Sequence, residues 1–135
     1  MSDKEIEVIL TRQLASYLAT PVFLVDPHGN LVYYNEAAET VLGRRFEETG
    51  EMSASEWATI FTPTDSEGTP VLPESLPLMI ALSEHRPSHR RFWIRGLDGA
   101  PRHIEVVAFP LKGQSDRELG AVAIFWELDE EQELK

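Results

Sequence analysis

The sequence contains no cysteine among its 135 residues. This absence excludes a disulfide-stabilised scaffold, a zinc site with cysteine ligands and a catalytic thiol. No apolar run approaches about 18 residues, so no membrane-spanning helix is predicted. The N-terminal residues MSDKEIE are charged and lack the apolar core of a secretory signal peptide. We therefore expect a cytoplasmic protein without a membrane partner.

Positive charge is also scarce. Lysine and arginine number 12 against 23 aspartates and glutamates, which leaves a formal net charge of −11. Because such a chain repels phosphate groups, the composition argues against a nucleic-acid partner. An acidic surface otherwise serves solubility.

Motifs for catalysis or metal binding are missing as well. The chain has no glycine-rich phosphate loop, nucleophile elbow or HExxH sequence. Its histidines are His28, His85, His89 and His103, and no pair of them is expected to form a metal site on a helix. No pair of carboxylates stands where burial would tune it for acid–base chemistry. We expect a protein that is not an enzyme and holds no metal.

The N-terminal segment has the pattern of an amphipathic helix over residues 2–19. Ser2 and Glu5 form a capping box, and the residue before Pro21 ends the helix. Its apolar stripe at helical spacing consists of Ile6, Ile9, Leu10, Leu14 and Tyr17. This stripe packs either on the sheet of its own domain or on the same helix of a second chain, and the two arrangements are compatible.

Residues 21–43 predict a β-hairpin followed by a short helix. Residues 23–26 and 30–34 are rich in residues that favour strands, and the Asp-Pro-His-Gly sequence between them is typical of a tight turn. Asn35 is a natural N-cap for the helix, and Gly43 suits its C-terminal end.

Two more short helices and two loops are predicted in the middle of the chain. Ser53 opens one helix with a capping box, and Pro73 suits the first position of the other. The inward side chains expected on the second helix are Leu76, Met79, Ile80 and Ala81. Residues 44–52 are polar and residues 62–72 are rich in Pro, Gly, Ser and Thr, so we expect both to be irregular.

Three strands are predicted after these helices, at residues 89–95, 102–111 and 119–126. In the first, Phe92 and Ile94 alternate with polar or exposed neighbours. The third is a continuous apolar run, which suits a central strand covered on both faces.

Two segments carry a resemblance to the PAS domain family. The hairpin and helix resemble the family pattern V-D-x-x-G-x-I-x-Y-x-N-x-A-A through Val25, Asp26, Gly29, Tyr33 or Tyr34, Asn35, Ala37 and Ala38. The later segment resembles a pattern common in the PAS domains of sensor kinases through Gly68, Pro70, Pro73, Pro77, Leu78, Ala81 and Leu82. The glycine that closes that pattern is absent here, since Glu84 and His85 stand in its place.

The resemblance implies an α+β fold, with a five-stranded antiparallel sheet, short helices on one face and the N-terminal amphipathic helix on the other. It divides the chain into a flanking helix (1–20), a PAS domain (21–128) and an acidic tail (129–135). It also implies a sensory or protein-interaction role in bacterial regulation, with a kinase or transcription regulator as partner. A homodimer through the N-terminal stripe is expected.

The resemblance further implies a ligand pocket between the sheet and the short helices. Strand parity and the family pattern place these side chains there: Phe23, Val25, Val32, Tyr34, Asn35, Leu42, Trp57, Phe61, Leu76, Met79, Ile80, Phe92 and Ile94. By the resemblance Tyr34 points at the ligand, and Tyr34 and Asn35 are its polar contacts. The alternative is a filled core in a pure dimerisation or interaction module.

No cofactor is expected. The flavin photochemistry of the LOV branch of the family requires a cysteine, which this chain lacks. Haem-binding PAS domains carry a histidine near the start of the helix that here begins with Pro73 and Glu74. We therefore expect neither covalent flavin nor haem, and a colourless protein.

Overall fold

The computed structural model describes residues 19–113, 115 and 117–128. The predicted N-terminal helix, its dimer stripe and the acidic tail lie outside these residues. The strands are β1 (Val22–Val25), β2 (Leu31–Tyr34), β3 (Ser88–Arg95), β4 (Pro101–Lys112) and β5 (Glu118–Glu127). The helices are α2 (Glu36–Leu42), α3 (Phe46–Thr49), α4 (Ala54–Ile60), the 3₁₀ helix η1 (Pro73–Ser75) and α5 (Pro77–Glu84).

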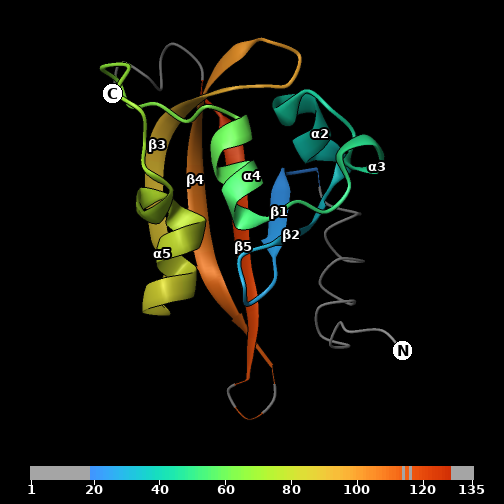
Figure 1. Cartoon of the computed structure of the whole chain (residues 1–135), viewed down its shortest axis with the longest axis vertical. Coiled ribbons are helices and arrows are strands. Elements are labelled where there is room, and N and C mark those ends of the chain that lie inside the picture. The colour runs from blue at the N-terminus through green and yellow to red at the C-terminus, as the bar shows by residue number, and fades with distance from the viewer. Residues whose placement is uncertain (1–18, 114, 116, 129–135) are drawn as a thin grey trace.

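The strands form one antiparallel sheet in the order β2-β1-β5-β4-β3. Helices α4 and α5 cover one face of it, which we call the inner face (Figure 1). The last strand is central, as the continuous apolar run predicts, and it pairs with the first strand. The expected α+β fold with five antiparallel strands is confirmed.

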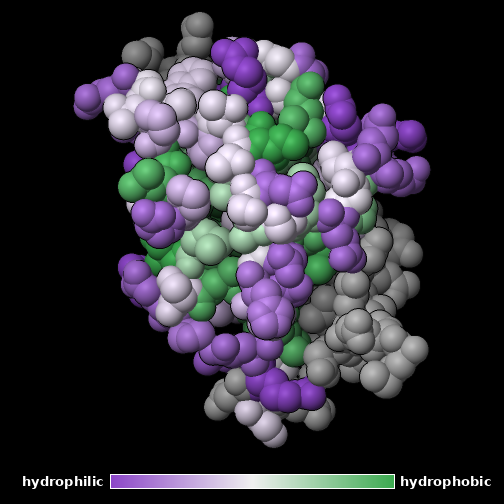
Figure 2. All heavy atoms as spheres, viewed as in Figure 1, coloured by the Kyte–Doolittle hydropathy of each residue, from purple (hydrophilic) through white to green (hydrophobic). Residues whose placement is uncertain are grey.

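Two hydrophobic clusters occupy the two faces. The inner cluster joins the inner side chains of the sheet to α2, α4 and α5. A smaller outer cluster lies on the opposite face and consists of Val22, Leu24, Val32, Leu119 and Val122. The outer surface of the helical layer is mixed, with hydrophilic residues around smaller hydrophobic areas (Figure 2). No helix in the described part of the chain is long and apolar enough to cross a membrane.

The β1–β2 hairpin forms where the sequence predicts it, but with a bulge. Asp26 Oδ1 accepts hydrogen bonds from His28 N at 2.9 Å and Asn30 N at 3.0 Å, which fixes the turn. Leu24 pairs with Tyr33, whereas Val25 pairs with Leu31, so Val32 is the extra residue. The bulge places Leu31 in the inner cluster and Val32 in the outer one.

Helix α2 follows the hairpin directly, as the cap pattern predicts. Asn35 Oδ1 accepts from Ala38 N at 3.1 Å, and Gly43 ends the helix with a left-handed backbone (φ 83°). The next segment is not irregular as expected, because α3 forms within it. Glu39 Oε2 of α2 accepts from Phe46 N at 2.9 Å and so satisfies a backbone donor at the start of α3.

Helices α4 and α5 differ in how well the sequence predicts them. The capping box of α4 is present, since Ser53 Oγ accepts from Glu56 N and Glu56 Oε1 accepts from Ser53 N. The second predicted helix is divided: Pro73 opens only η1, Leu76 is extended, and α5 begins at Pro77. Because the helical phase restarts there, Leu78 and Ala81 are buried while Met79 and Ile80 are only partly buried.

The segment 62–72, expected as a loop, is tied to the sheet. Thr64 N donates to Trp93 O at 2.8 Å and Trp93 N donates to Thr64 O at 2.7 Å, so Thr64 extends the edge of β3. Asp65 Oδ1 closes a turn by accepting from Glu67 N and Thr69 N. The pairing covers part of the exposed edge of β3.

Candidate functional site: an apolar cavity inside the core

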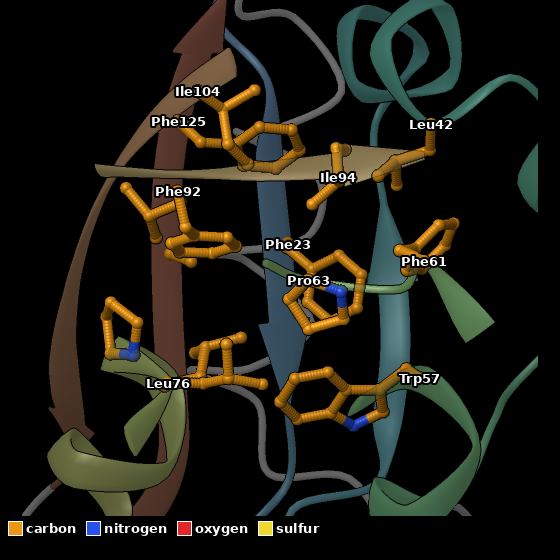
Figure 3. Close-up of a pocket in the computed structure, with 14 residues that line it drawn as sticks. Phe23, Leu42, Trp57, Phe61, Pro63, Leu76, Phe92, Ile94, Ile104 and Phe125 are labelled. Atoms are coloured by element: carbon orange, nitrogen blue, oxygen red, sulfur yellow. The ribbon is translucent and has the colours of Figure 1, made fainter. Parts of the chain in front are cut away.

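A cavity of about 70 Å³ lies between the inner face of the sheet and the helices (Figure 3). Strands β1, β3, β4 and β5 line one side of it, while α2, α4, Pro63 and the start of α5 line the other. The lining residues are Phe23, Leu42, Trp57, Phe61, Pro63, Leu76, Pro77, Leu78, Phe92, Ile94, Ile104, Val106, Ala123 and Phe125. Both layers of the domain therefore contact the same small space.

The sheet supplies the cavity wall through alternation. Phe92 pairs with Ile104 and Val106 pairs with Phe125, so these side chains project from adjacent strands to the same face. Ala123 lies on that face of β5, next to Phe23 of β1. Because alanine ends at Cβ, it leaves room where a larger side chain would reach toward the helices.

Helix α4 supplies the opposite wall. Trp57 and Phe61 stand four residues apart, which places both rings on one side of the helix. The Trp57 ring meets the Phe23 ring edge to face, with centroids 5.3 Å apart. Trp57 Nε1 donates to Gly29 O at 2.7 Å, which fixes the indole against the hairpin turn. The rings therefore have few alternative positions.

The cavity offers no free side-chain hydrogen-bonding group. Among the lining residues, all of which the structure describes, the indole nitrogen of Trp57 is the one polar side-chain atom, and Gly29 O already takes its proton. The remaining side chains are hydrocarbon. Neither acid–base catalysis nor metal binding is within the reach of such a lining.

Seven of the residues expected at a pocket do line the cavity, and six do not. The first group is Phe23, Leu42, Trp57, Phe61, Leu76, Phe92 and Ile94. The second is Val25, Val32, Tyr34, Asn35, Met79 and Ile80. The placement of Val32 on the pocket face is wrong, because the bulge in β2 turns it to the outer cluster. Met79 and Ile80 do not line the cavity. The helix α5 begins at Pro77 rather than at Pro73, so its inward side is formed by other residues than predicted.

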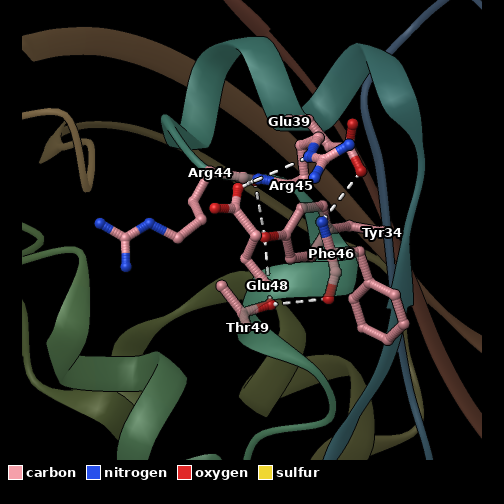
Figure 4. A network of polar contacts seen from close by, with 7 residues as sticks. All are labelled: Tyr34, Glu39, Arg44, Arg45, Phe46, Glu48 and Thr49. Atoms are coloured by element: carbon pink, nitrogen blue, oxygen red, sulfur yellow. Dashed lines mark hydrogen bonds and ion pairs between the residues drawn. The ribbon is translucent and has the colours of Figure 1, made fainter.

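Tyr34 belongs to the core next to the cavity rather than to its lining. Its ring is parallel to that of Phe23, with centroids 6.1 Å apart. Its hydroxyl donates to Arg44 O at 2.8 Å and lies 3.2 Å from Thr49 Oγ1. These contacts connect β2 to α3 and to the chain just before it (Figure 4). Burial raises the pKa of the Tyr34 phenol. The hydroxyl that we expected to contact a ligand is thus bonded to other parts of the fold.

Asn35 is likewise occupied by the fold. Besides capping α2, its Oδ1 accepts from Val22 N at 3.0 Å, and its Nδ2 donates to Thr20 O at 2.9 Å. It is fully buried with these partners and is not among the residues that line the cavity.

The sequence interpretation missed seven lining residues: Pro63, Pro77, Leu78, Ile104, Val106, Ala123 and Phe125. The alternation along β4 was a sufficient signal for Ile104 and Val106, which share the face of Phe92. Ala123 and Phe125 lie in a continuous apolar run, where periodicity carries no information about the face. Pro63 comes from the predicted loop, whose path over the core the sequence does not reveal.

Histidines and carboxylates stay outside the cavity. His85 Nδ1 lies 2.9 Å from Glu118 Oε1 at the surface, and the His103 ring stacks on Trp93 with centroids 4.7 Å apart. Within the described ranges, no three histidine, aspartate or glutamate side chains form a possible metal site.

The sheet order, the short helices over one face and the cavity between them agree with the comparison to known families. The family model described as PAS domain matches residues 19–128. This chain belongs to the PAS domain family. Proteins of this family generally sense signals or mediate interactions, and they are generally not catalytic. A comparison with curated protein sequences finds no match.

Several solved structures share this fold at low sequence identity. The PAS domain of BvgS from Bordetella pertussis is 17% identical, with a TM-score of 0.69 and coverage of 96% of this chain and 92% of that one. The PAS domain of the nitrogen regulation protein NR(II) from Vibrio parahaemolyticus is 19% identical, with a TM-score of 0.61 and coverage of 88% and 98%. The LOV protein of Rhodobacter sphaeroides is 15% identical, with a TM-score of 0.72 and coverage of 93% and 70%.

Proposed function

We propose that this PAS domain is a signal-input module that binds a small molecule in its core cavity. The observation that carries the proposal is the cavity itself, because its walls come from the sheet and from the helices at once. An occupant can favour one arrangement of the two layers only if it binds that arrangement more tightly, by about 1.4 kcal/mol for each tenfold preference. A cytoplasmic location and a bacterial kinase or transcription regulator as the recipient are parts of the same proposal.

A flavin or haem does not fit this input role. Sites for drug-sized ligands usually measure about 300–1,000 Å³, whereas this cavity measures about 70 Å³. The lining has no free polar side chain for an isoalloxazine or a propionate, and the chain has no cysteine for a flavin adduct. We therefore propose that the purified protein is colourless, and a Soret or flavin absorption band would contradict this.

The second candidate function is a dimerisation or interaction module with a filled core. The small cavity volume favours it, and so does the outer apolar cluster on the face away from the helices. Under this alternative the stripe Ile6, Ile9, Leu10, Leu14 and Tyr17 would supply the interface, and the cavity would be a packing defect.

Occupancy of the freshly purified protein distinguishes the two candidates. Native mass spectrometry reports a retained ligand and the oligomeric state, and headspace gas chromatography of the unfolded protein detects volatile occupants. The control is Ala123→Leu, which extends a side chain into the cavity. A molecule recovered from the parent but not from this variant supports the sensor, whereas a parent that also stays empty when it is equilibrated with propane favours the interaction module.

A further inference from the structure

We infer that the core cavity takes an uncharged molecule without hydrogen-bonding groups, no larger than a single hydrocarbon ring. A dissolved nonpolar gas or a small hydrocarbon has this chemistry. The inference rests on the proposed sensory function and specifies the ligand class of the same site. It follows from three properties of the lining: its backbone groups are paired, it carries no charge, and its volume is small.

The backbone around the cavity is already hydrogen-bonded. On the sheet side, Phe92, Ile104, Val106 and Phe125 belong to continuous antiparallel ladders. On the helix side, four carbonyl oxygens are taken as well: Leu42 O by Leu97 N, Phe61 O by Arg95 N, Pro63 O by Val71 N and Leu76 O by Ile80 N. The Trp57 indole is bonded to Gly29 O. A hydroxyl, amide or carboxylate on the ligand would therefore lose its water and find no free partner.

Charge is equally disfavoured in the cavity. None of its lining side chains is ionisable. The Tyr34 hydroxyl in the neighbouring core donates its hydrogen bond to Arg44 O. An ion among these hydrocarbon side chains would give up hydration that no counter-charge compensates for. Carboxylates and ammonium compounds are thereby excluded as occupants.

The volume sets the upper size. An apolar cavity of about 150 Å³ remains dry and binds benzene or xenon, and the cavity described here has about half that volume. Xenon and hydrocarbons of a few carbons therefore fit between the walls as they stand, and a single ring requires the walls to move. The rings of Phe23, Trp57 and Phe92 face the space and offer polarisable surface to such an occupant (Figure 3).

Methyl NMR of the whole chain tests this inference with matched probes. Xenon and propane are the apolar probes, and 1-propanol and acetate are the polar ones, all at the same concentration. Xenon and propane should shift the methyl signals of Ile94, Ile104 and Val106 saturably. The methyl signals of Val22, Leu24 and Val122, which lie on the outer face, should not shift. Ala123→Leu should reduce xenon affinity at least tenfold.

Two further variants keep the test decisive. Ala123→Val suits a β-strand and fills part of the space if Ala123→Leu does not fold, and it should weaken xenon binding in proportion. Val122→Ile adds a carbon on the outer face and should leave xenon binding unchanged. Saturable binding of 1-propanol or acetate at the inner methyl groups, as tight as that of propane, would overturn the inference. So would the absence of inner shifts with both apolar probes.

The outcome can be separated from that of the proposed function. A polar molecule recovered from the purified protein, with inner methyl groups insensitive to xenon, would refute the apolar ligand class and leave the sensor proposal standing. Xenon binding in a protein whose signalling partner responds equally to the parent and to Ala123→Leu would support the ligand class and refute the sensor proposal.

Discussion

The side chain of Asn35 makes at least three hydrogen bonds from a fully buried position. Its oxygen accepts from Ala38 N and Val22 N, and its nitrogen donates to Thr20 O. Asn35→Ala should therefore cost more than the loss of a cap alone, on the order of 2–4 kcal/mol, because two buried donors lose their partner. Urea unfolding measures this as a lower midpoint at an unchanged slope.

Ser53 provides the matched control for Asn35. It caps α4 through the same kind of bond but is partly exposed, so water can replace its hydroxyl. Ser53→Ala should cost about 1 kcal/mol. Equal losses in the two variants would show that the bonds to Val22 and Thr20 add nothing to stability.

Gly120 is required by the close approach of β5 to β1. A Cβ atom added there would clash with Val25 O, and the backbone φ is +127°. Gly120→Ala must therefore push β5 away from β1. We expect a loss of at least about 3 kcal/mol in thermal or urea unfolding.

The control is Gly99→Ala in the β3–β4 turn. Gly99 also has a positive φ, of +87°, but nothing lies within 4 Å of its added Cβ. Its cost should be confined to backbone strain, about 1–2 kcal/mol. If Gly120→Ala costs no more stability than Gly99→Ala, the clash expected with Val25 O does not destabilise the sheet.

The sequence predicts the role of a residue well when that role is local. The cap of Asn35 follows from its position before a helical pattern and is confirmed, but its bonds to Val22 and Thr20 depend on tertiary contacts. Strand parity is correct for Phe92 and Ile94. It fails for Val32, because a bulge adds one residue and reverses the face without leaving a mark in the sequence.

At the scale of elements, the tip of the β3–β4 hairpin is fixed to the end of α2. Leu97 N donates to Leu42 O at 2.7 Å, and Arg102 Nη2 binds Asp98 Oδ2 at 3.0 Å. The hydrogen bond from Arg102 is the main reason that the pKa of Asp98 falls from 3.8 to about 2, and a bond from Ala100 N lowers it further. The ionised form of Asp98 therefore favours the folded tip.

This dependence predicts a specific response to acid. The lowered pKa contributes stability that is fully present above about pH 4 and is lost as the pH falls through about 2. As the pH falls over this range, the stability advantage of the wild type over Asp98→Asn should therefore shrink. Urea midpoints measured from about pH 5 to pH 2 provide the test.

Arg102→Gln is the control for the acid response, because it removes the main cause of the shift. The difference in stability between Arg102→Gln and Asp98→Asn should vary little with pH. A constant difference between wild type and Asp98→Asn across the same range would contradict the assignment to Asp98.

The sequence also predicts where most elements lie, and it fails where neighbours decide the outcome. Helix α3 has only four residues, and a donor at its start is satisfied by Glu39 of another helix. Its Phe46 ring contacts both Tyr34 and Tyr33, with centroids 5.3 and 5.5 Å away. So short a helix has little stability of its own, and its polar sequence carries no clear period. The helical phase of α5 differs from the prediction because the extended backbone at Leu76 separates η1 from α5.

At the scale of the whole molecule, the two faces of the sheet have different coverings. The helices pack on the inner face, whereas the outer cluster of Val22, Leu24, Val32, Leu119 and Val122 consists of strand residues. Tyr33, Phe109, Leu111 and Ile124 extend this apolar area as partly buried neighbours. The predicted N-terminal stripe has the apolar character that such a face requires, and Pro21 places the end of that segment directly before β1.

We predict a homodimer in which the N-terminal stripes pack on each other and on the outer faces of the sheets. Burying an apolar side chain of this size contributes about 1.5–3 kcal/mol before ordering costs, and a short helix is marginal alone. Replacing Leu10 and Leu14 by Glu would introduce unpaired charge into that contact. Analytical ultracentrifugation should show a dimer for the parent and a monomer for this double variant.

The matched control replaces Thr11 and Ala15 by Glu, which adds the same charge at the same spacing on the opposite side of the predicted helix, and it should remain dimeric. A parent protein that sediments as a monomer at high micromolar concentration would show that the stripe serves only its own sheet.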